Sequence, residues 1–531
     1  MSATMIAAPV EATADERFHW EVLVVVMIGT VMSALDISIV NVSLPNMMST
    51  FGAGVDAIEW VVTGYMLAFS TFMPLTAWLR DRLGSRVLYM ACLAIFTIGS
   101  VLCALAPNLP MLVLARVLQA VGGGALTPTG MAMIAEVFPP AERGRAFGIW
   151  GIGVIAGPAF GPPLGGYLTQ VFGWRSIFDI NLPIGIIGLI MASRILRRDR
   201  PHPSTFRGFD LPGFLLLTTF LISALLGISN GNEHGWTSPF VLSCGALSVV
   251  ALALFLTVES IVTDRILDLG LFRNVQFTVA MVVTASRSVA LYGGLFLLPL
   301  FLRNQMGRSE IETGLLLLPG ALVIGVVMPL AAQAADKFGA RLPTLVGLVM
   351  TAWFMWMYRT LDPTTSYWNV LFPTLIRGIG IGLLVTPVMT VGLNAVPTHK
   401  AGMASSMLAL IQQIAGSLGI AVLASVLGHR ASFHMGVVGE GMEATRPAFL
   451  EATHAIAARA LSLGVAPMDA GLTGSALVAR HVAQGAQVLA FNDAFLVGGA
   501  VVLLGIVPAL FLDATPRPRK PNAEPRPEML E

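Results

Sequence analysis

Fourteen stretches of about twenty mainly apolar residues follow one another along this 531-residue chain. A stretch of that length crosses a bilayer as an α-helix, because a helix satisfies its backbone hydrogen bonds internally where no water is present. Only 11% of the residues are charged, whereas an average soluble protein has roughly 25%. These features predict an all-α membrane protein, with fourteen transmembrane helices at residues 21–43, 58–78, 87–106, 110–134, 145–168, 177–195, 210–229, 239–259, 276–301, 312–332, 342–360, 369–393, 403–428 and 491–512.

The charge balance and several missing motifs exclude other classes of protein. The chain carries 31 basic and 30 acidic residues, and its formal net charge of +1 is too small to attract it to nucleic acid. None of its lysines follows a glycine, as the lysine of a phosphate-binding loop does, and all eight histidines lie outside the predicted spans. We therefore expect a protein that is not an enzyme, with no catalytic residue, metal site, cofactor or nucleic-acid partner.

The basic residues are divided unequally between the two sides of the predicted membrane. With the N-terminus inside, twenty Lys and Arg residues fall on the cytoplasmic side and eight on the outer side, four of them in one long segment. Because short cytoplasmic loops are enriched in basic residues, this division predicts a multi-pass protein with both termini in the cytoplasm. No small-residue cleavage site follows the first apolar run, so we expect that run to be retained as a span.

A short charged motif occurs twice, 255 residues apart, and indicates an internal repeat. Its positions after the second and tenth spans are Asp81, Arg82, Gly84 and Arg86, and Asp336, Lys337, Gly339 and Arg341. The repeat predicts a cytoplasmic tail at 1–20, a six-helix bundle at 21–195, a linker with two extra helices at 196–275, a second six-helix bundle at 276–512 and a cytoplasmic tail at 513–531. Parallel repeats of this kind place a substrate site between the two bundles, near the middle of the membrane.

Two interpretations remain open for the charged loops and for the long outer segment at 429–488. Each loop is either a latch that closes in one conformation, through a helix terminus or an arginine, or an ordinary basic anchor of a cytoplasmic helix end. The outer segment is either a solvated flap or a docking surface for a partner.

Asp36 is an acidic residue inside the first predicted span. An ionised carboxylate at that depth is costly without a partner, and burial favours its protonated form, as a proton-coupling site requires. Arg116 lies in the fourth span and shares a helix face with Gln119. We expect Arg116 to act on the coupling carboxylate, although a fixed Asp36–Arg116 ion pair with a purely structural role is the alternative.

Further polar residues in the spans are candidates for the substrate cavity, namely Asn41, Gln119, Arg287 and Arg377. Arg377 follows the repeat, because it precedes glycines and a Thr-Pro pair as Arg116 does. Arg287 falls near the expected counterpart of Asp36. Two roles remain equally open for Arg287, namely contact with the substrate and pairing that only stabilises the fold.

The fifth span has a glycine at every fourth position, together with Gly-Pro pairs. The ladder and its prolines are Gly153, Gly157, Pro158, Gly161, Pro162 and Gly165. Small residues at this spacing allow close helix contact, and proline bends a helix. We expect a hinge at the contact between the two bundles.

Four of these features together resemble the major facilitator superfamily, and within it the fourteen-span drug:proton antiporters of the EmrB/QacA group, closest to EmrB. They are the strings from Leu35-Asp36 to Pro45, from Arg116 to Gly122, from Gly153 to Gly166, and Trp174-Arg175 followed by Ile180 to Gly185. The resemblance covers residues from about 20 to 512. It implies a major facilitator fold, with two six-helix bundles and two inserted helices.

The resemblance also implies roles and partners. It assigns proton coupling to Asp36 and Arg116 and gating to the loop at 81–86, although Ala77 and Ser85 replace a glycine and a basic residue of the family pattern. It implies an inner-membrane pump that works with a periplasmic adaptor and an outer-membrane channel.

The sequence therefore predicts a proton-coupled efflux antiporter for several hydrophobic or amphipathic small molecules, which works by alternating access in the lipid bilayer and draws its energy from the proton gradient. One alternative is a dedicated exporter of a single endogenous metabolite or lipid. An alternative of another class is a membrane sensor or scramblase without proton coupling.

Overall fold

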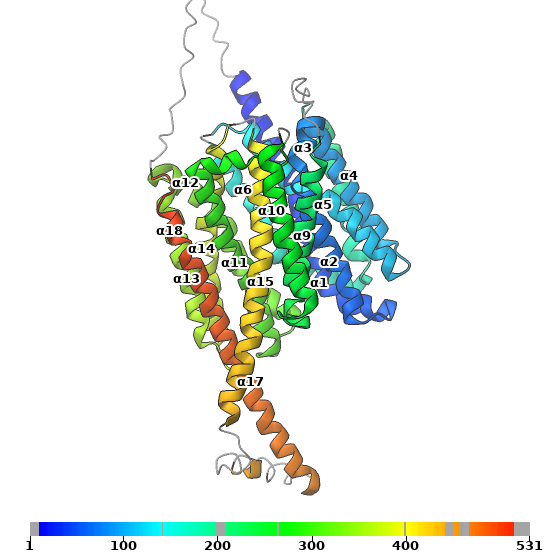
Figure 1. Cartoon of the computed structure of the whole chain (residues 1–531), viewed down its shortest axis with the longest axis vertical. Helices are drawn as coiled ribbons and strands as arrows, with labels where there is room; N and C mark the ends of the chain where they lie inside the picture. Colours follow the sequence, from blue (N-terminus) through cyan, green and yellow to red (C-terminus); the bar gives the residue numbers. More distant parts are fainter. Residues whose placement is uncertain are drawn as a thin grey trace, which may run out of the picture.

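The computed structural model describes residues 10–140, 142–197, 209–262, 265–397, 400–440, 451, 453–455, 458 and 467–514. These residues form a bundle of long, roughly parallel and antiparallel helices, and no strand occurs among them (Figure 1). Eleven helices in this part are long and apolar enough to cross a membrane, or twelve if one bent pair is a single span. The all-α membrane fold is thus confirmed, and the count of fourteen stays a prediction with which the structure is consistent.

The helices follow the order of the predicted spans. The first half contains α1 (Val10–Phe51), α2 (Val55–Phe72), α3 (Leu75–Leu83), α4 (Ser85–Ala104), α5 (Leu109–Val137), α6 (Arg143–Phe172), α7 (Ser176–Asp179) and α8 (Asn181–Ile195). The pair predicted to be inserted corresponds to α9 (Leu211–His234) and α10 (Pro239–Ile261). The second half contains η1 (Leu269–Arg273), α11 (Val275–Asn304), α12 (Glu310–Phe338), α13 (Arg341–Met357), η2 (Tyr358–Thr360), α14 (Tyr367–Asn394), α15 (Ala401–Glu440), α17 (Pro467–Leu504) and α18 (Ile506–Ala509).

Local sequence explains where several helices begin and end. Asn108 accepts a hydrogen bond from the backbone of Met111 and so caps α5, and Ser309 forms a reciprocal capping box with Glu312 at the start of α12. The two repeated loops end α3 and α12 at Gly84 and Gly339, whose φ angles are +82° and +78°. Only glycine adopts this left-handed conformation without strain, which accounts for a glycine at the same position of both loops.

One predicted span is bent, and the last two extend beyond their predicted bounds. The span predicted at 58–78 lies within α2 and α3, which meet at 55° next to Pro74, the residue before the second helix. The spans predicted at 403–428 and 491–512 are parts of α15 and α17, which project beyond the rest of the bundle (Figure 1, bottom). The long segment at 429–488 therefore begins and ends as helix, and residues 441–450, 452, 456–457 and 459–466 within it lie outside the described part.

The two halves touch along α6 and α12. A side chain at Gly148 of α6 would collide with the backbone of Pro329 of α12, and one at Gly314 of α12 would lie 2.8 Å from Pro163 of α6. The two contacts lie fifteen positions apart on each helix, so α6 and α12 approach closely along much of their length.

We call the end of the bundle that carries Arg80, Arg82 and Arg86 the arginine-rich end (Figure 1, top). Here α15 of the second half also packs against α3 and α5 of the first. The apolar core of the first half continues across this contact to Met407 and Leu408 of α15.

Candidate functional site

The carboxylate of Asp36 and the guanidinium of Arg116 form an ion pair in the interior of the first half. Asp36 lies on α1 and Arg116 on α5, and each is 1% exposed. Arg116 Nη1 donates to Asp36 Oδ2 at 2.6 Å, and Arg116 Nε donates to the carbonyl of Val61 on α2 at 3.3 Å. The structure thus brings together the two residues that the sequence predicted for proton coupling.

Three neutral polar side chains complete the network around this pair. Gln119 accepts from Arg116 Nη1 at 2.6 Å and donates to Asp36 Oδ1 at 2.8 Å and to the Ser100 hydroxyl at 2.6 Å. Asn181, at the start of α8, donates to Asp36 Oδ1 at 3.4 Å and to Ser100 at 3.2 Å. The network therefore joins side chains of four helices, α1, α4, α5 and α8, and those of α5 and α8 bind the carboxylate directly.

Ser100 and Asn181 were not predicted as site residues. Ser100 is one small polar residue in an apolar run, and Asn181 was noted only as part of the string from Ile180 to Gly185. A neutral side chain costs little in a span when it has a partner, so hydropathy alone did not distinguish these two.

Aromatic rings and glycines close the network off. The Arg116 guanidinium lies 4.0 Å from the centre of the Tyr65 ring and 5.7 Å from that of Phe178. A side chain at Gly99 of α4 would collide with the backbone of Gln119, so the glycine there allows α4 to approach α5. The result is a buried, hydrogen-bonded ion pair, and loss of one partner from such a pair costs about 3–5 kcal/mol.

The charge of Asp36 determines how strongly this arrangement is held together. While Asp36 is ionised, it neutralises Arg116 and ties α1 to α5. When Asp36 takes up a proton, the attraction is lost and Arg116 keeps only neutral acceptors at Gln119 and Val61. Protonation can therefore change the packing of α1 against α5.

Asn41, Arg287 and Arg377 lie apart from this network. Asn41 is an exposed residue of α1. Arg287 of α11 is buried and donates to Gln412 of α15 at 2.9 Å, and Arg377 of α14 is buried beside Gly294 of α11. Arg287 is therefore not the structural counterpart of Asp36, because the α11 residue that faces the second-half arginine is Gly294.

The charged loops hold helix ends at the arginine-rich end. Arg86 donates to the carbonyl of Ser193 on α8, and Arg341 donates to that of Leu512 after α18. Arg82 lies over the ring of Trp78, and Lys337 lies over that of Phe338.

Arg80, which was not predicted as a site residue, lies between the two halves. It pairs with Asp81 at 3.1 Å and with Glu136 of α5 at 2.8 Å. A side chain at Gly402 of α15 would collide with the Arg80 guanidinium. The buried cation next to the loop therefore makes the contact with the second half, and its neighbour Asp81 is one of its anchors.

A second ion pair at the same end joins the linker to α15. Lys400 Nζ donates to Asp268 at 2.6 Å, and the backbone N–H of Gly270 donates to the same carboxylate at 2.9 Å. Burial alone would raise the pKa of Asp268, but the hydrogen bonds from Lys400 and Gly270 outweigh it and hold that pKa below its ordinary value.

The glycine ladder of α6 faces a different neighbour from the one expected. Side chains added at Gly157, Gly161 and Gly165 would meet α1, at Ala34, Ser38 and Ile39, and Gly153 faces Val31 of the same helix. The contact with the second half is made by another stripe of α6, at Gly144, Gly148 and Gly151. The expectation that the ladder lies at the contact between bundles was therefore wrong, because the two stripes point in different directions around the helix.

The prolines of the ladder lie inside a continuous helix. Pro158 and Pro162 belong to α6, which runs from Arg143 to Phe172. Pro162 is described in full, whereas the side chain of Pro158 is outside the described part of the chain. The hinge itself stays a prediction.

Comparison with known proteins gives the family. Residues 26–420, about three quarters of the chain, match the model of the Major Facilitator Superfamily. The chain belongs to the major facilitator superfamily. It is a multi-pass membrane transporter and not an enzyme.

Two relatives and one solved structure illustrate the similarity. The chain is 33% identical to the uncharacterized MFS-type transporter YhcA of Bacillus subtilis, over 92% of each protein. It is 36% identical to the multidrug resistance protein Stp of Mycobacterium tuberculosis, over 76% of this chain and 75% of that protein. The crystal structure of the human organic anion transporter MFSD10 (TETRAN) superimposes with a TM-score of 0.58, covering 92% of this chain and 99% of that one, and at 14% identity it shows the fold alone.

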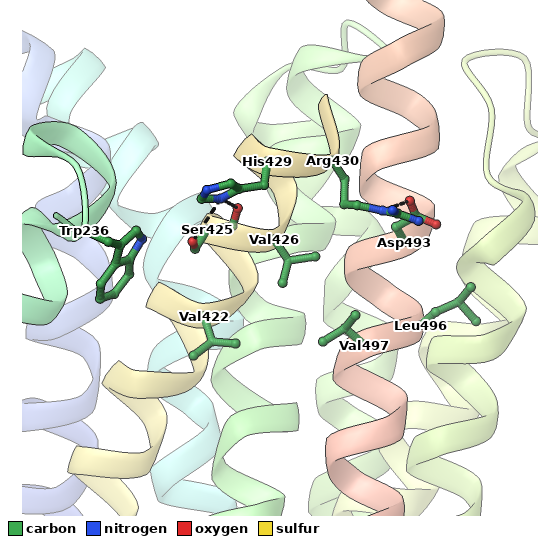
Figure 2. Close-up of a pocket in the computed structure, with 9 residues that line it drawn as sticks. All are labelled: Trp236, Val422, Ser425, Val426, His429, Arg430, Asp493, Leu496 and Val497. Atoms are coloured by element: carbon green, nitrogen blue, oxygen red, sulfur yellow. Dashed lines mark hydrogen bonds and ion pairs between the residues drawn. The ribbon is translucent and has the colours of Figure 1, made fainter. Parts of the chain in front are cut away.

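This major facilitator protein also has an open groove of about 730 Å³ far from Asp36, at the end where α15 and α17 project. Figure 2 shows Val422, Val426 and Val497 along its floor, with Trp236 of the α9–α10 loop on one side. Arg430 of α15 and Asp493 of α17 pair across it at 2.5 Å. The groove thus lies between the second half and the inserted helices, and the pair ties the two projecting helices together.

Proposed function

We propose that this protein is a proton-coupled efflux antiporter for hydrophobic or amphipathic small molecules, which works by alternating access. The observation that carries the proposal is the Asp36–Arg116 pair. It contains a carboxylate, 1% exposed, inside a membrane bundle, bound by three side chains from two other helices, α5 and α8. Intramembrane carboxylates of this kind mark proton relays.

The contacts between the halves support alternating access. At the arginine-rich end, Ser405 of α15 donates to the carbonyl of Pro128 on α5 at 3.0 Å, and Arg143 of α6 donates to Asn394 of α14 at 2.7 Å. Together with the apolar contact of α15, these polar contacts close one end of the bundle. Because α1 carries Asp36 and packs on the α6 ladder, while another stripe of α6 packs on the second half, a change at Asp36 reaches the contact between the halves through one helix.

The names of two further relatives support export, rather than uptake, as the direction of transport. The chain is 30% identical, over 96% of its length, to the tetracenomycin C resistance and export protein of Streptomyces glaucescens. It is 32% identical, over 78% of its length, to the methylenomycin A resistance protein of Bacillus subtilis. Each of these names mentions one compound, and this favours the second candidate function, a dedicated exporter of a single metabolite.

The membrane, orientation and partners that we propose follow from the sequence and from the resemblance to the EmrB/QacA group. We propose that the protein lies in the inner membrane with both termini, and hence the arginine-rich end, in the cytoplasm, and that it is of the EmrB/QacA type. A periplasmic adaptor and an outer-membrane channel are partners that this resemblance implies.

The test uses proteoliposomes with an internal pH dye and a panel of hydrophobic dyes and antibiotics. The wild type should exchange protons for several compounds, or for one if it is dedicated. Asp36→Asn should abolish the exchange, and Asp362→Asn, an exposed loop residue, should not. Full proton-coupled transport by a correctly folded Asp36→Asn protein would overturn the proposal, and compound movement without proton movement in the wild type would favour an uncoupled protein.

A further inference from the structure

The second half of the protein buries two guanidinium groups without a carboxylate. The acidic residues between 276 and 428 are Glu310, Glu312, Asp336 and Asp362, and all four lie at helix ends or in a loop. Arg287 and Arg377 lie within α11 and α14 and are 4% and 2% exposed. Farther along the second half, Asp493 of α17 pairs with Arg430 and His434 at the projecting end. The first half neutralises its buried arginine with Asp36, whereas Arg287 and Arg377 form no ion pair among the described residues.

Arg377 occupies the position that Arg116 has in the first half. It lies 261 residues after Arg116, and the two charged loops are 255 residues apart. A Cβ atom at Gly294 would lie 3.7 Å from Arg377 Nη1, and Gly294 lies 258 residues after Asp36, between those two offsets. The helix that carries the acid in the first half therefore carries a glycine at the same place in the second.

Two nitrogen atoms of this guanidinium are left unpaired. Among the described residues, Arg377 Nε and Nη1 have no hydrogen-bond partner, although both are buried. A buried cation without a counter-charge is costly in a membrane interior, where arginines pair with acids or line a functional pathway. The planar guanidinium matches a carboxylate, which can accept two of its hydrogen bonds side by side.

Arg287 adds a second positive charge on the same helix as Gly294. The two residues are seven positions apart on α11, two turns along one face, or about 10 Å. Arg287 Nη2 donates to the amide oxygen of Gln412, and its Nε has no partner among the described residues. The Gln412 amide in turn donates to the Tyr292 hydroxyl at 3.4 Å. The partner of Arg287 and the group behind that partner are therefore both neutral.

We propose that the second half binds the anionic group of the transported compound at Arg377, in the place that Asp36 fills in the first half, with Arg287 as the second cation. This rests on the proposed efflux function and names its substrate class as hydrophobic organic anions such as aryl carboxylates. An inorganic anion such as chloride carries the same negative charge that a guanidinium binds. The experiment distinguishes an inorganic anion from an organic one.

The first arm of the experiment needs no substrate. A Cβ atom at Gly294 would be 3.4 Å from Phe354 and 3.7 Å from Arg377, which are ordinary contact distances. Gly294→Asp supplies the missing carboxylate, and Gly294→Asn has nearly the same shape without the charge. In detergent, the aspartate variant should unfold at a higher temperature than the asparagine variant. Equal or reversed unfolding temperatures would overturn the site.

The second arm uses three probes with one ring system, 1-naphthoate, its methyl ester and 1-naphthylmethylammonium. Only 1-naphthoate should raise the unfolding temperature of the wild type, and Arg377→Gln and Gly294→Asp should each weaken its binding at least tenfold. The other outcome is that sodium chloride raises the unfolding temperature of the wild type relative to sodium gluconate, while 1-naphthoate neither raises it further nor competes with chloride. In that case the ligand is an inorganic anion and the substrate assignment is overturned.

Proton movement in proteoliposomes separates this proposal from the efflux function. If no probe of any charge moves protons, but Gly294→Asp is more stable than Gly294→Asn and 1-naphthoate binds, the anion site stands and the antiport function fails. If all three probes drive proton exchange equally in the wild type and in Gly294→Asp, antiport stands and the anion site is overturned.

Discussion

Gly157 of α6 packs directly on Ala34 of α1, two residues before Asp36, and this makes Gly157→Ala an informative change. A Cβ atom at position 157 would lie 2.7 Å from Ala34 Cβ and still closer to the Ala34 carbonyl group. Carbon atoms that are not bonded prefer about 3.5–4.0 Å, so α1 and α6 must move apart by about 1 Å. Overpacking of this kind costs about 1–3 kcal/mol.

The displacement should also reach the site. Asp36 lies on the same turn of α1 as Ala34, and a shift of α1 by about 1 Å should disturb its 2.6 Å hydrogen bond from Arg116 of α5, because such bonds tolerate only a narrow range of lengths. Gly157→Ala should therefore lower stability by about 1–3 kcal/mol and also reduce proton exchange.

Gly166→Ala, on the same helix, is the matched control. The nearest atom to a Cβ there is 3.9 Å away, on Val42, so the methyl group fits. Alanine also favours helix over glycine by up to about 1 kcal/mol, and the control should be neutral or stabilising. Thermal unfolding in detergent, followed by tryptophan fluorescence, and proton release in proteoliposomes measure both effects. An unchanged Gly157→Ala protein, or equal losses in the two variants, would refute the packing argument.

Three other changes have defined outcomes. The pKa of Asp268 is depressed, so its ion pair should stabilise the folded protein fully above the ordinary Asp pKa of about 3.9. This stabilisation should be lost as the pH falls through the depressed pKa. The unfolding temperature, measured as a function of pH, should show this loss in the wild type and not in Asp268→Asn. Gly402→Ala should displace Arg80 and open the arginine-rich end, seen as a longer distance between spin labels at Leu83 and Phe338, and an unchanged distance would contradict this. Exchange of one organic anion for one proton moves two charges, worth about 4.6 kcal/mol per 100 mV, so a potassium diffusion potential should accelerate it more than exchange of a neutral compound, and equal acceleration would argue against anion transport.

Much of the site was predictable because charge is rare and costly inside a membrane. Asp36 and Arg116 stand out from apolar runs, and the structure joins them at 2.6 Å. Ser100 and Asn181 were missed because neutral polar residues leave little trace in hydropathy, although both bond to the network. Arg80 was counted only as a basic loop residue, and its burial depends on α15, more than 300 positions away in the chain.

The sequence by itself determined the membrane class, the order of the helices, the repeated loops with their left-handed glycines and the buried charges. These follow from local properties, namely the length of an apolar run, the conformation that glycine alone tolerates and the cost of a charge in hydrocarbon. Only the tertiary structure decided which stripe of α6 faces α1 and which faces α12, and that Gly294 rather than Arg287 lies opposite Arg377. Such contacts depend on the rotation and register of helices from distant parts of the chain, which no single stretch of residues specifies.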